Sequence, residues 1–257
     1  MTQYQGLWMA RGIEALQSLQ ETQAGNIAMA AEWCADAIGA DGMVHLFGSG
    51  HSRIPVEEMF PRYASFPGFN PIVELSTTFH TQIVGSNGQR QAMFIERVSG
   101  LAEAVLENFS FGERDVYMGF SVSGSSAVPV EMLMGAKARG LRTIAVTSAS
   151  ANGAMGRQAD LVIDLKVPRG DALIKLEGAE SPVGPVSTLL YVAVVNEIKV
   201  QTAAILLAEG KLPPVLTGAS IVGERRSREL FTAAYEEHAR RASKILRGAT
   251  ARMGNLA

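Results

Sequence analysis

The chain has 257 residues, of which 47% are hydrophobic and 19% are charged, a balance that excludes a disordered protein and predicts a folded globular one. Its formal net charge is −2 and the basic residues are spread along the chain, which argues against nucleic acid or an anionic membrane surface as a partner. The single cysteine, Cys34, excludes an internal disulfide.

The first fourteen residues mix polar and apolar side chains and lack the pattern of a signal peptide. No apolar run approaches the roughly 20 residues that a membrane-spanning helix needs. We therefore expect a cytoplasmic protein without a membrane span.

The first part of the chain predicts helices followed by a strand. Apolar residues recur at mixed helical spacings over residues 7–38, which indicates one or two amphipathic helices. Residues 43–47 form a short apolar run that ends in Gly-Ser-Gly, as a buried strand that opens into a tight turn does. A short helix with Pro55 in its first turn follows, and residues 63–87 are predicted to be mostly loop, with a strand candidate at 72–75.

From residue 89 onward, strands and helices alternate. We expect helices over residues 89–108 and 127–139 and a long apolar helix over 186–207, which could pack against the sheet or against a second subunit. Strands are predicted at 115–120, 143–146 and 161–165. Such alternation predicts an α/β protein, a three-layer α/β/α sandwich around a mainly parallel sheet.

The chain carries no internal repeat and no low-complexity linker, so we expect a single domain over residues 1–257. Its core would span about 40–210. Helices over residues 5–39 would precede the core, and a polar helical extension over 223–253 would follow it.

Two serine-bearing turns are the strongest candidates for chemistry. Gly48-Ser49-Gly50-His51-Ser52 and Ser121-Val122-Ser123-Gly124-Ser125-Ser126 each lie between a predicted buried strand and a helix. At such a place backbone N–H groups and the positive end of the helix dipole favour an anion, and glycine lets the ligand approach closely. Ser52 and Ser126 could also be ordinary N-caps, and spacing alone leaves a nucleotide phosphate possible.

Together these turns and three further motifs resemble the SIS (sugar isomerase) family, and within it a stand-alone group described as phosphosugar-binding or phosphoheptose-isomerase-like. The resemblance covers about residues 16–223. The further motifs are Thr147-Ser148, Gly170-Asp171-Ala172 and Gly184-Pro185-Val186-Ser187-Thr188.

The resemblance implies a five-stranded parallel sheet and a homo-oligomer, dimer or tetramer, with sites near subunit contacts. It also implies that the anionic group of a sugar lies against the second turn, while side chains of the first turn approach the ligand from the neighbouring strand. The substrate-binding residues implied in this way are Ser49, His51, Ser52, Ser121, Ser123 and Ser126.

An aldose–ketose isomerase needs a base that moves a proton between C1 and C2 and an acid that assists at the oxygens. Glu57 and Glu58 lie about 100° apart on the predicted helix, so one of them would face the ligand; the resemblance favours Glu58. Glu96 is a second carboxylate candidate, and His80, in a loop, is the histidine candidate. The alternatives are salt bridges for the glutamates and a solvated loop histidine.

No metal-ligand pattern, Walker lysine motif or complete dinucleotide fingerprint is present in the sequence, so we expect neither a metal nor a cofactor. The predicted function is isomerisation of a phosphorylated or sulfonated sugar between aldose and ketose through an enediol. The alternatives are a phosphosugar lyase or etherase, and a non-catalytic sensor that binds a sugar phosphate.

Overall fold

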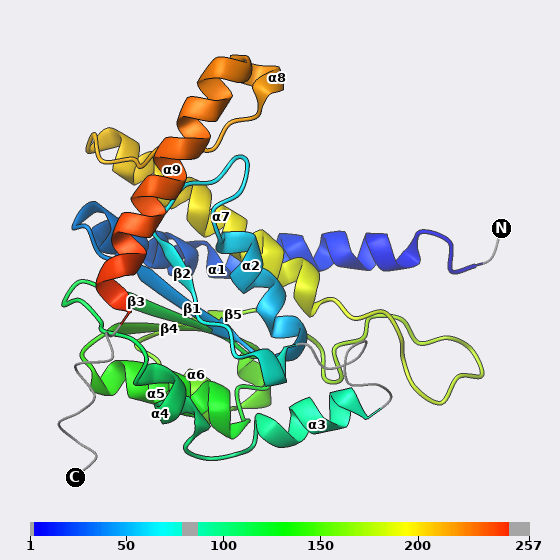
Figure 1. Cartoon of the computed structure of the whole chain (residues 1–257). Helices are drawn as coiled ribbons and strands as arrows, with labels where there is room; N and C mark the ends of the chain where they lie inside the picture. Colours follow the sequence, from blue (N-terminus) through cyan, green and yellow to red (C-terminus); the bar gives the residue numbers. More distant parts are fainter. Residues whose placement is uncertain (1–2, 79–86, 247–257) are drawn as a thin grey trace, which may run out of the picture.

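The computed structural model describes residues 3–78 and 87–246, and a five-stranded parallel sheet lies at its centre (Figure 1). The order across the sheet is β2-β1-β3-β4-β5, and every neighbouring pair is parallel. The strands are β1 (Val44–Gly48), β2 (Phe69–Pro71), β3 (Val116–Phe120), β4 (Arg142–Thr147) and β5 (Leu161–Asp164).

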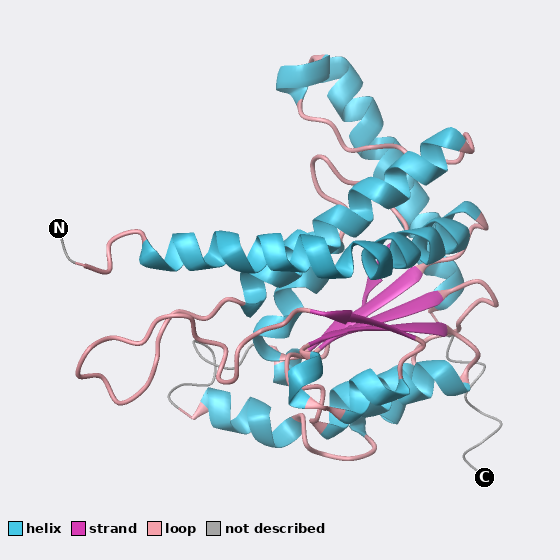
Figure 2. Ribbon diagram, turned by 180° about the vertical axis from the view of Figure 1, so that it is seen from behind, coloured by secondary structure: helices cyan, strands magenta, loops and turns pink. Residues whose placement is uncertain are grey.

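Helices cover both faces of the sheet, which confirms the predicted three-layer α/β/α sandwich (Figures 1 and 2). On one face lie α1 (Leu7–Gly39), α2 (Ile54–Met59) and α7 (Ser187–Ala208). On the other lie α4 (Leu101–Leu106), α5 (Ala127–Ala138) and α6 (Ala154–Gln158). All residues of β1 and β3 are buried, because a parallel sheet between two helical layers has no solvent face.

Successive residues of β3 divide between two cores. Met118 packs into the core formed with α1 and α7, whereas Tyr117 packs into the core formed with α4 and α5. This alternation follows from the two-residue period of a strand. It also explains why the strands read as continuous apolar runs rather than as alternating patterns.

Helix α7 is long and apolar enough to cross a membrane by length and composition. In this fold the same residues have another use, because Leu190, Tyr191 and Val194 are buried in the core against α1 and the sheet. The apolar residues on the buried face of α7 are therefore explained by its position as a core helix.

Two boundaries differ from the prediction. The expected helix over residues 89–108 is two helices, α3 (Gly88–Ile95) and α4, because Gly100 adopts φ 90° and its N–H donates to Glu131 Oε2 at 2.8 Å. The strand expected at 72–75 lies earlier, as β2, and is followed by the short 3₁₀ helix η2 (Leu75–Thr77). Residues 7–39 form one continuous helix, which is one of the two arrangements that the apolar spacing predicted.

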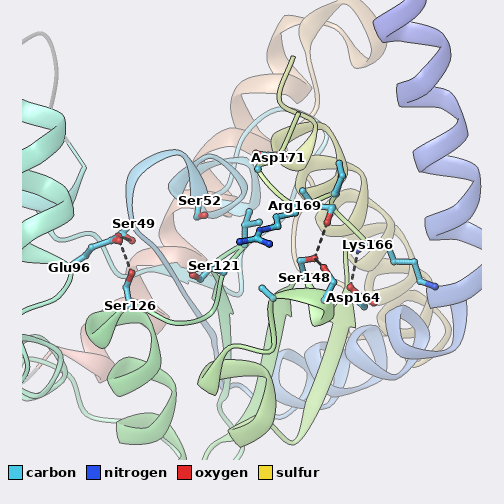
Figure 3. A pocket seen from close by; sticks show the side chains of 17 residues that line it. Ser49, Ser52, Glu96, Ser121, Ser126, Ser148, Asp164, Lys166, Arg169 and Asp171 are labelled. Carbon is cyan, nitrogen blue, oxygen red and sulfur yellow. Dashed lines mark hydrogen bonds between the residues drawn. The ribbon is translucent and has the colours of Figure 1, made fainter. Parts of the chain in front are cut away.

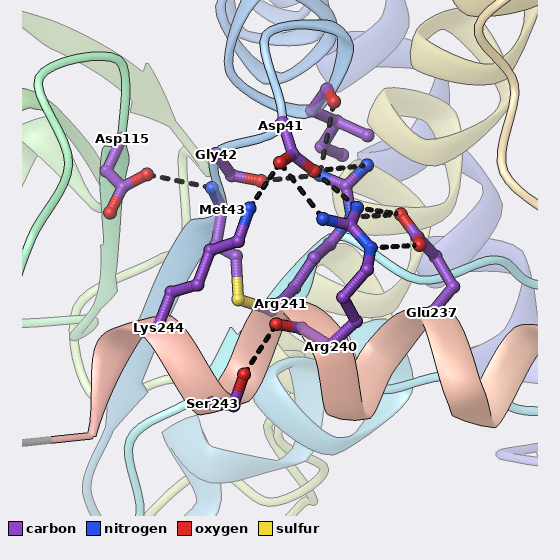
Figure 4. A network of polar contacts seen from close by, with 10 residues as sticks. Asp41, Gly42, Met43, Asp115, Glu237, Arg240, Arg241, Ser243 and Lys244 are labelled. Atoms are coloured by element: carbon purple, nitrogen blue, oxygen red, sulfur yellow. Dashed lines mark hydrogen bonds and ion pairs between the residues drawn. The ribbon is translucent and has the colours of Figure 1, made fainter.

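Two further helices complete the described chain, α8 (Ala219–Val222) and α9 (Glu224–Ile245). A polar network holds the end of α9 against the connection between α1 and β1 (Figure 4). The buried Arg241 donates to the carbonyl of Gly42 at 2.7 Å and to that of Ile38 at 3.1 Å. Asp41 accepts hydrogen bonds from Arg240 and Lys244.

Asp41 is the acidic centre of this network and adopts φ 65°, a conformation that asparagine also tolerates. Hydrogen bonds from Arg240 and Lys244 hold the pKa of its carboxyl well below the ordinary value of 3.8. The carboxylate therefore stabilises the fold above that pH, and the contribution is lost as the pH falls below it.

We predict that Asp41→Asn lowers the free energy of unfolding at pH 7 by about 1 kcal/mol or less, since Asp41 is half-exposed and solvent screens its ion pairs. The difference from wild type should shrink in high salt and shrink progressively as the pH falls below 3.8. Urea unfolding at two salt concentrations and two pH values measures it. A difference that does not change with salt or with falling pH would mean that the ion pairs are not its cause.

Candidate functional site

A cavity of about 1030 Å³ opens where the carboxyl ends of β1, β3, β4 and β5 meet (Figure 3). The residues that line it come from the end of β5, from the loops that follow the four strands, and from Glu96 at the end of α3. Ligands of open parallel sheets collect at this edge, because loops from several strands converge there. Five of the six predicted binding residues line the cavity, namely Ser49, Ser52, Ser121, Ser123 and Ser126.

The first serine turn folds back tightly on itself. Ser49 precedes the 3₁₀ helix η1 (Gly50–Arg53), and the N–H of Ser52 donates to the carbonyl of Ser49 at 3.1 Å. A Cβ atom on Gly48 would lie 2.1 Å from the carbonyl oxygen of Ser52, so only glycine fits at the end of β1. This close approach places Ser49 and Ser52 on the same cavity wall.

The second serine turn joins β3 to α5. Ser121 Oγ accepts a hydrogen bond from the N–H of Gly124 at 3.1 Å, and Gly124 adopts φ 57°. Ser126 occupies the N-cap position of α5, but its side chain makes no capping bond to the helix. Within the described residues, the N–H groups of Ser123, Ser126 and Ala127 make no hydrogen bond and are available to an anion.

Glu96 links the two serine turns. Its carboxylate accepts a hydrogen bond from Ser49 Oγ at 2.8 Å and another from Ser126 Oγ at 2.7 Å. Its backbone carbonyl accepts the N–H of Val128, in the first turn of α5, at 2.9 Å. The hydroxyl of Ser126 is therefore used at the cavity and not as a helix cap, and a half-buried carboxylate lies between the turns.

The other two carboxylates of the cavity are occupied by backbone groups. Asp164 accepts the N–H groups of Ala149 and Lys166, both at 2.9 Å. Asp171 accepts the N–H groups of Val186 and Ser187 at the start of α7, at 3.0 and 2.9 Å. These aspartates shape the loops, so Glu96 is the lining carboxylate that contacts only hydroxyl side chains.

The structure places the other predicted site residues elsewhere. Glu58 is bound by Arg62 at 2.8 Å and by Asn196 of α7 at 3.3 Å, and it does not line the cavity. His51 is exposed on η1 and does not line the cavity either. His80 lies outside the described residues. Catalysis by Glu58 and His80 and substrate binding by His51 stay predictions.

The analysis of the sequence missed the contribution of the loop after β5. Lys166 and Arg169 line the cavity from this loop, and Ser148 and Ser150 line it from the loop after β4. Arg53, at the end of η1, does not line the cavity and pairs with Glu57 at 2.6 Å. The signal for the missed loop was the Gly170-Asp171-Ala172 motif, which directly follows Arg169.

The described part of the chain contains no clear metal-binding centre. In residues 3–78 and 87–246, no group of three or more His, Cys, Asp or Glu side chains is arranged to hold a metal ion. The donor set of the cavity is mainly hydroxyl and backbone N–H, which suits an oxyanion better than a cation.

Comparison with known proteins gives the family. The family model of the SIS domain matches residues 8–148. A UPF0309 protein of Brucella anthropi is 34% identical over 212 residues, which cover 80% of this chain and 85% of that protein. A UPF0309 protein of Brucella abortus is 31% identical over 233 residues, covering 88% of this chain and 93% of the relative.

Two solved structures share the fold. The phosphoheptose isomerase of Neisseria gonorrhoeae superposes with a TM-score of 0.52 at 17% identity, covering 76% of this chain and 95% of that one. A phosphoheptose isomerase from Francisella tularensis superposes with a TM-score of 0.51 at 16% identity, covering 79% and 98%. With the serine turns, the parallel sheet and these matches together, the chain belongs to the SIS-domain proteins and, within them, to the UPF0309 family.

Proposed function

We propose that the protein is an aldose–ketose isomerase that acts on a sugar with a phosphate or sulfonate group. The observation that supports this most is the position of Glu96, whose carboxylate lies in the same cavity as two serine turns suited to an anion. An isomerase of anionic sugars needs both parts, one to hold the charged end and one to move a proton at the reacting end.

The serine turns would bind the anionic group. Ser121 and Ser123 offer hydroxyls, whereas the hydroxyl of Ser126 already donates to Glu96 and its backbone N–H would face the anion. The unpaired N–H groups of the second turn lie at the start of α5. Because the N–H donors belong to a turn whose backbone packs closely against Gly153, little ordering would be needed when the ligand binds. The charged end would thereby set the distance of C1 and C2 from Glu96.

Glu96 would act as the base. In the first step, Glu96 would take the proton from C2 of the aldose while an acid protonates O1, which gives the enediol. In the second step, the proton on O2 is lost and a proton is delivered to C1, which gives the ketose. The protons balance without an oxidant or a metal. His80 is the histidine that we propose for the oxygen-side proton transfers, and the two serine hydroxyls would keep the Glu96 carboxylate oriented.

A homo-oligomer belongs to the same proposal. Helices α1 and α7 share a surface with a groove of about 390 Å³ whose lining includes Leu16, Leu19 and Val194. Val200, near this groove on α7, is 66% exposed. A second copy of the chain is the occupant that we propose, since the resemblance to SIS proteins implies homo-oligomers and apolar surface of this kind favours association.

We predict that phosphorylated sugars bind and that their neutral parent sugars do not. Ribose 5-phosphate, glucose 6-phosphate, a heptose 7-phosphate and the sulfonated sugar sulfoquinovose form a suitable panel for calorimetric titration. Ser123→Ala should weaken binding of the best ligand about tenfold, the loss of one hydrogen bond to a charged group. Ser125→Ala, in the same turn but outside the lining, is the matched control. Equal affinities of both variants would argue against the serine site.

We predict that Glu96→Gln lowers the turnover of the best-binding sugar at least about 100-fold, because the amide cannot accept the C2 proton. Glutamine keeps one acceptor and one donor for the two serines, so the turns should hold. The readout is solvent deuterium incorporated at C2. Glu58→Gln serves as the comparison: loss of exchange in that variant alone would assign the base to Glu58.

We predict that light scattering finds a dimer or larger oligomer for the wild-type chain and that Val200→Glu shifts it toward the monomer. Burying a carboxylate in an apolar contact is costly, which gives the substitution its effect. Ile221→Glu changes an apolar residue of α8 that is 79% exposed and serves as the control. A monomeric wild type would contradict the proposed oligomer, and an effect of Ile221→Glu alone would contradict the proposed surface.

A further inference from the structure

Two cationic side chains of the cavity lack a partner within the described chain. Lys166 and Arg169 both belong to the loop after β5, both are exposed, and neither side chain makes a hydrogen bond or ion pair there. Arginines with nearby carboxylates usually pair with them, as Arg53 and Arg62 do with two glutamates of α2. An unpaired arginine in a cavity lined with anion-binding turns is available to a ligand.

A well-defined turn carries Arg169. The N–H of Asp171 donates to the carbonyl of Pro168 at 2.9 Å, and Gly170 between them adopts φ 86°. Glycine at the third position with positive φ is typical of a type II turn, in which Arg169 occupies the second position.

Both ends of this turn are anchored to the fold. On one side Val167 is buried and its carbonyl accepts the hydroxyl of Ser148 at 3.2 Å. On the other side the carboxylate of Asp171 accepts two N–H groups at the start of α7 and the hydroxyl of Ser187 at 2.5 Å. Arg169 therefore extends from a fixed base, and only its side chain has to adjust to a ligand.

The two cations point in different directions (Figure 3). The guanidinium of Arg169 extends across the cavity toward Ser52 and Ser121, whereas the ammonium of Lys166 points away from the serine turns. The loop thus presents Arg169 to the cavity, and Lys166, which has the same charge but points away, is a matched control for the effect of charge alone.

The charge of the cavity favours such a cation. The serine turns contribute neutral donors only, and the lining carries the carboxylates Glu96, Asp164 and Asp171. A phosphate ester brings a charge of about −1.5 to −2 at pH 7 into this acidic surrounding. Neutral hydroxyls and N–H groups alone would compensate that charge poorly, and a guanidinium offers a fork that matches two phosphate oxygens.

We propose that Arg169 is the cationic ligand of the substrate's anionic group, which it would hold against the 121–126 turn from the opposite side of the cavity. This inference rests on the proposed function and adds a residue and a charge requirement to it. The doubly charged phosphate should gain more from Arg169 than the singly charged sulfonate does, so the inference also selects a phosphate ester as the substrate class.

The test measures binding of inorganic phosphate and of methanesulfonate to the full chain by calorimetry at constant ionic strength. Arg169→Ala should weaken phosphate binding about tenfold or more, and Lys166→Ala should change it less than about twofold. Arg169→Lys should bind with intermediate affinity, because it keeps the charge and loses the fork. Wild type should prefer phosphate to methanesulfonate, and the preference should shrink in Arg169→Ala.

Equal losses in Arg169→Ala and Lys166→Ala would overturn the inference, since they would reflect the general charge of the loop. Equal binding of phosphate and methanesulfonate by wild type would overturn the selection of a phosphate ester. If wild type bound sugar phosphates but Arg169→Ala bound them as well as wild type does, the proposed function would stand and the inference would fall. If wild type bound none of these anions, both would fall.

Discussion

The contact on which the candidate site depends is the double hydrogen bond of Glu96 to Ser49 and Ser126. One serine follows β1 and the other precedes α5, so a single carboxylate connects the loops of two neighbouring strands. Hydrogen bonds to a charged group are stronger than those between neutral groups. The contact therefore sets the spacing of the turns and at the same time leaves a carboxylate in the cavity.

Close packing of backbone against backbone makes this arrangement possible. Gly48 lies against the carbonyl of Ser52, and Gly153 lies against the carbonyl of Ser123, each so near that a Cβ atom would be only 2.1 Å away. Such contacts leave no space for a side chain and draw the loops inward. The aspartates Asp164 and Asp171 then fasten the loops of the far side to backbone N–H groups, so the cavity walls come from four strand ends.

Opposite the cavity, at the amino ends of the strands, polar groups have a structural use. His45 lies fully buried in β1 between Asp115, at 2.9 Å, and Asn70, at 3.0 Å, as expected for a satisfied core histidine. Arg241 and Asp41 fasten α9 nearby. The candidate site thus lies at the carboxyl ends of the strands, and this structural network lies at their amino ends. The role of a charged residue can be assigned only once it is known at which of the two ends it lies.

The sequence by itself determined the layers, the strands and the serine turns, because apolar runs, glycines and hydroxyls act locally and repeat with the period of each element. The local pattern also misled where a distant residue decides the structure. The apolar spacing of a helix continues past Gly100, but Gly100 is the residue before α4, and Glu131 accepts its N–H. Only the tertiary structure decided which glutamate lies in the cavity. Glu58 and Glu96 are alike in sequence terms, but α7 binds the first and two serine turns bind the second. Arg169 was missed for the same reason, since its direction depends on a turn anchored to β4 and α7, and contacts between residues distant in the chain leave no periodic trace in the sequence.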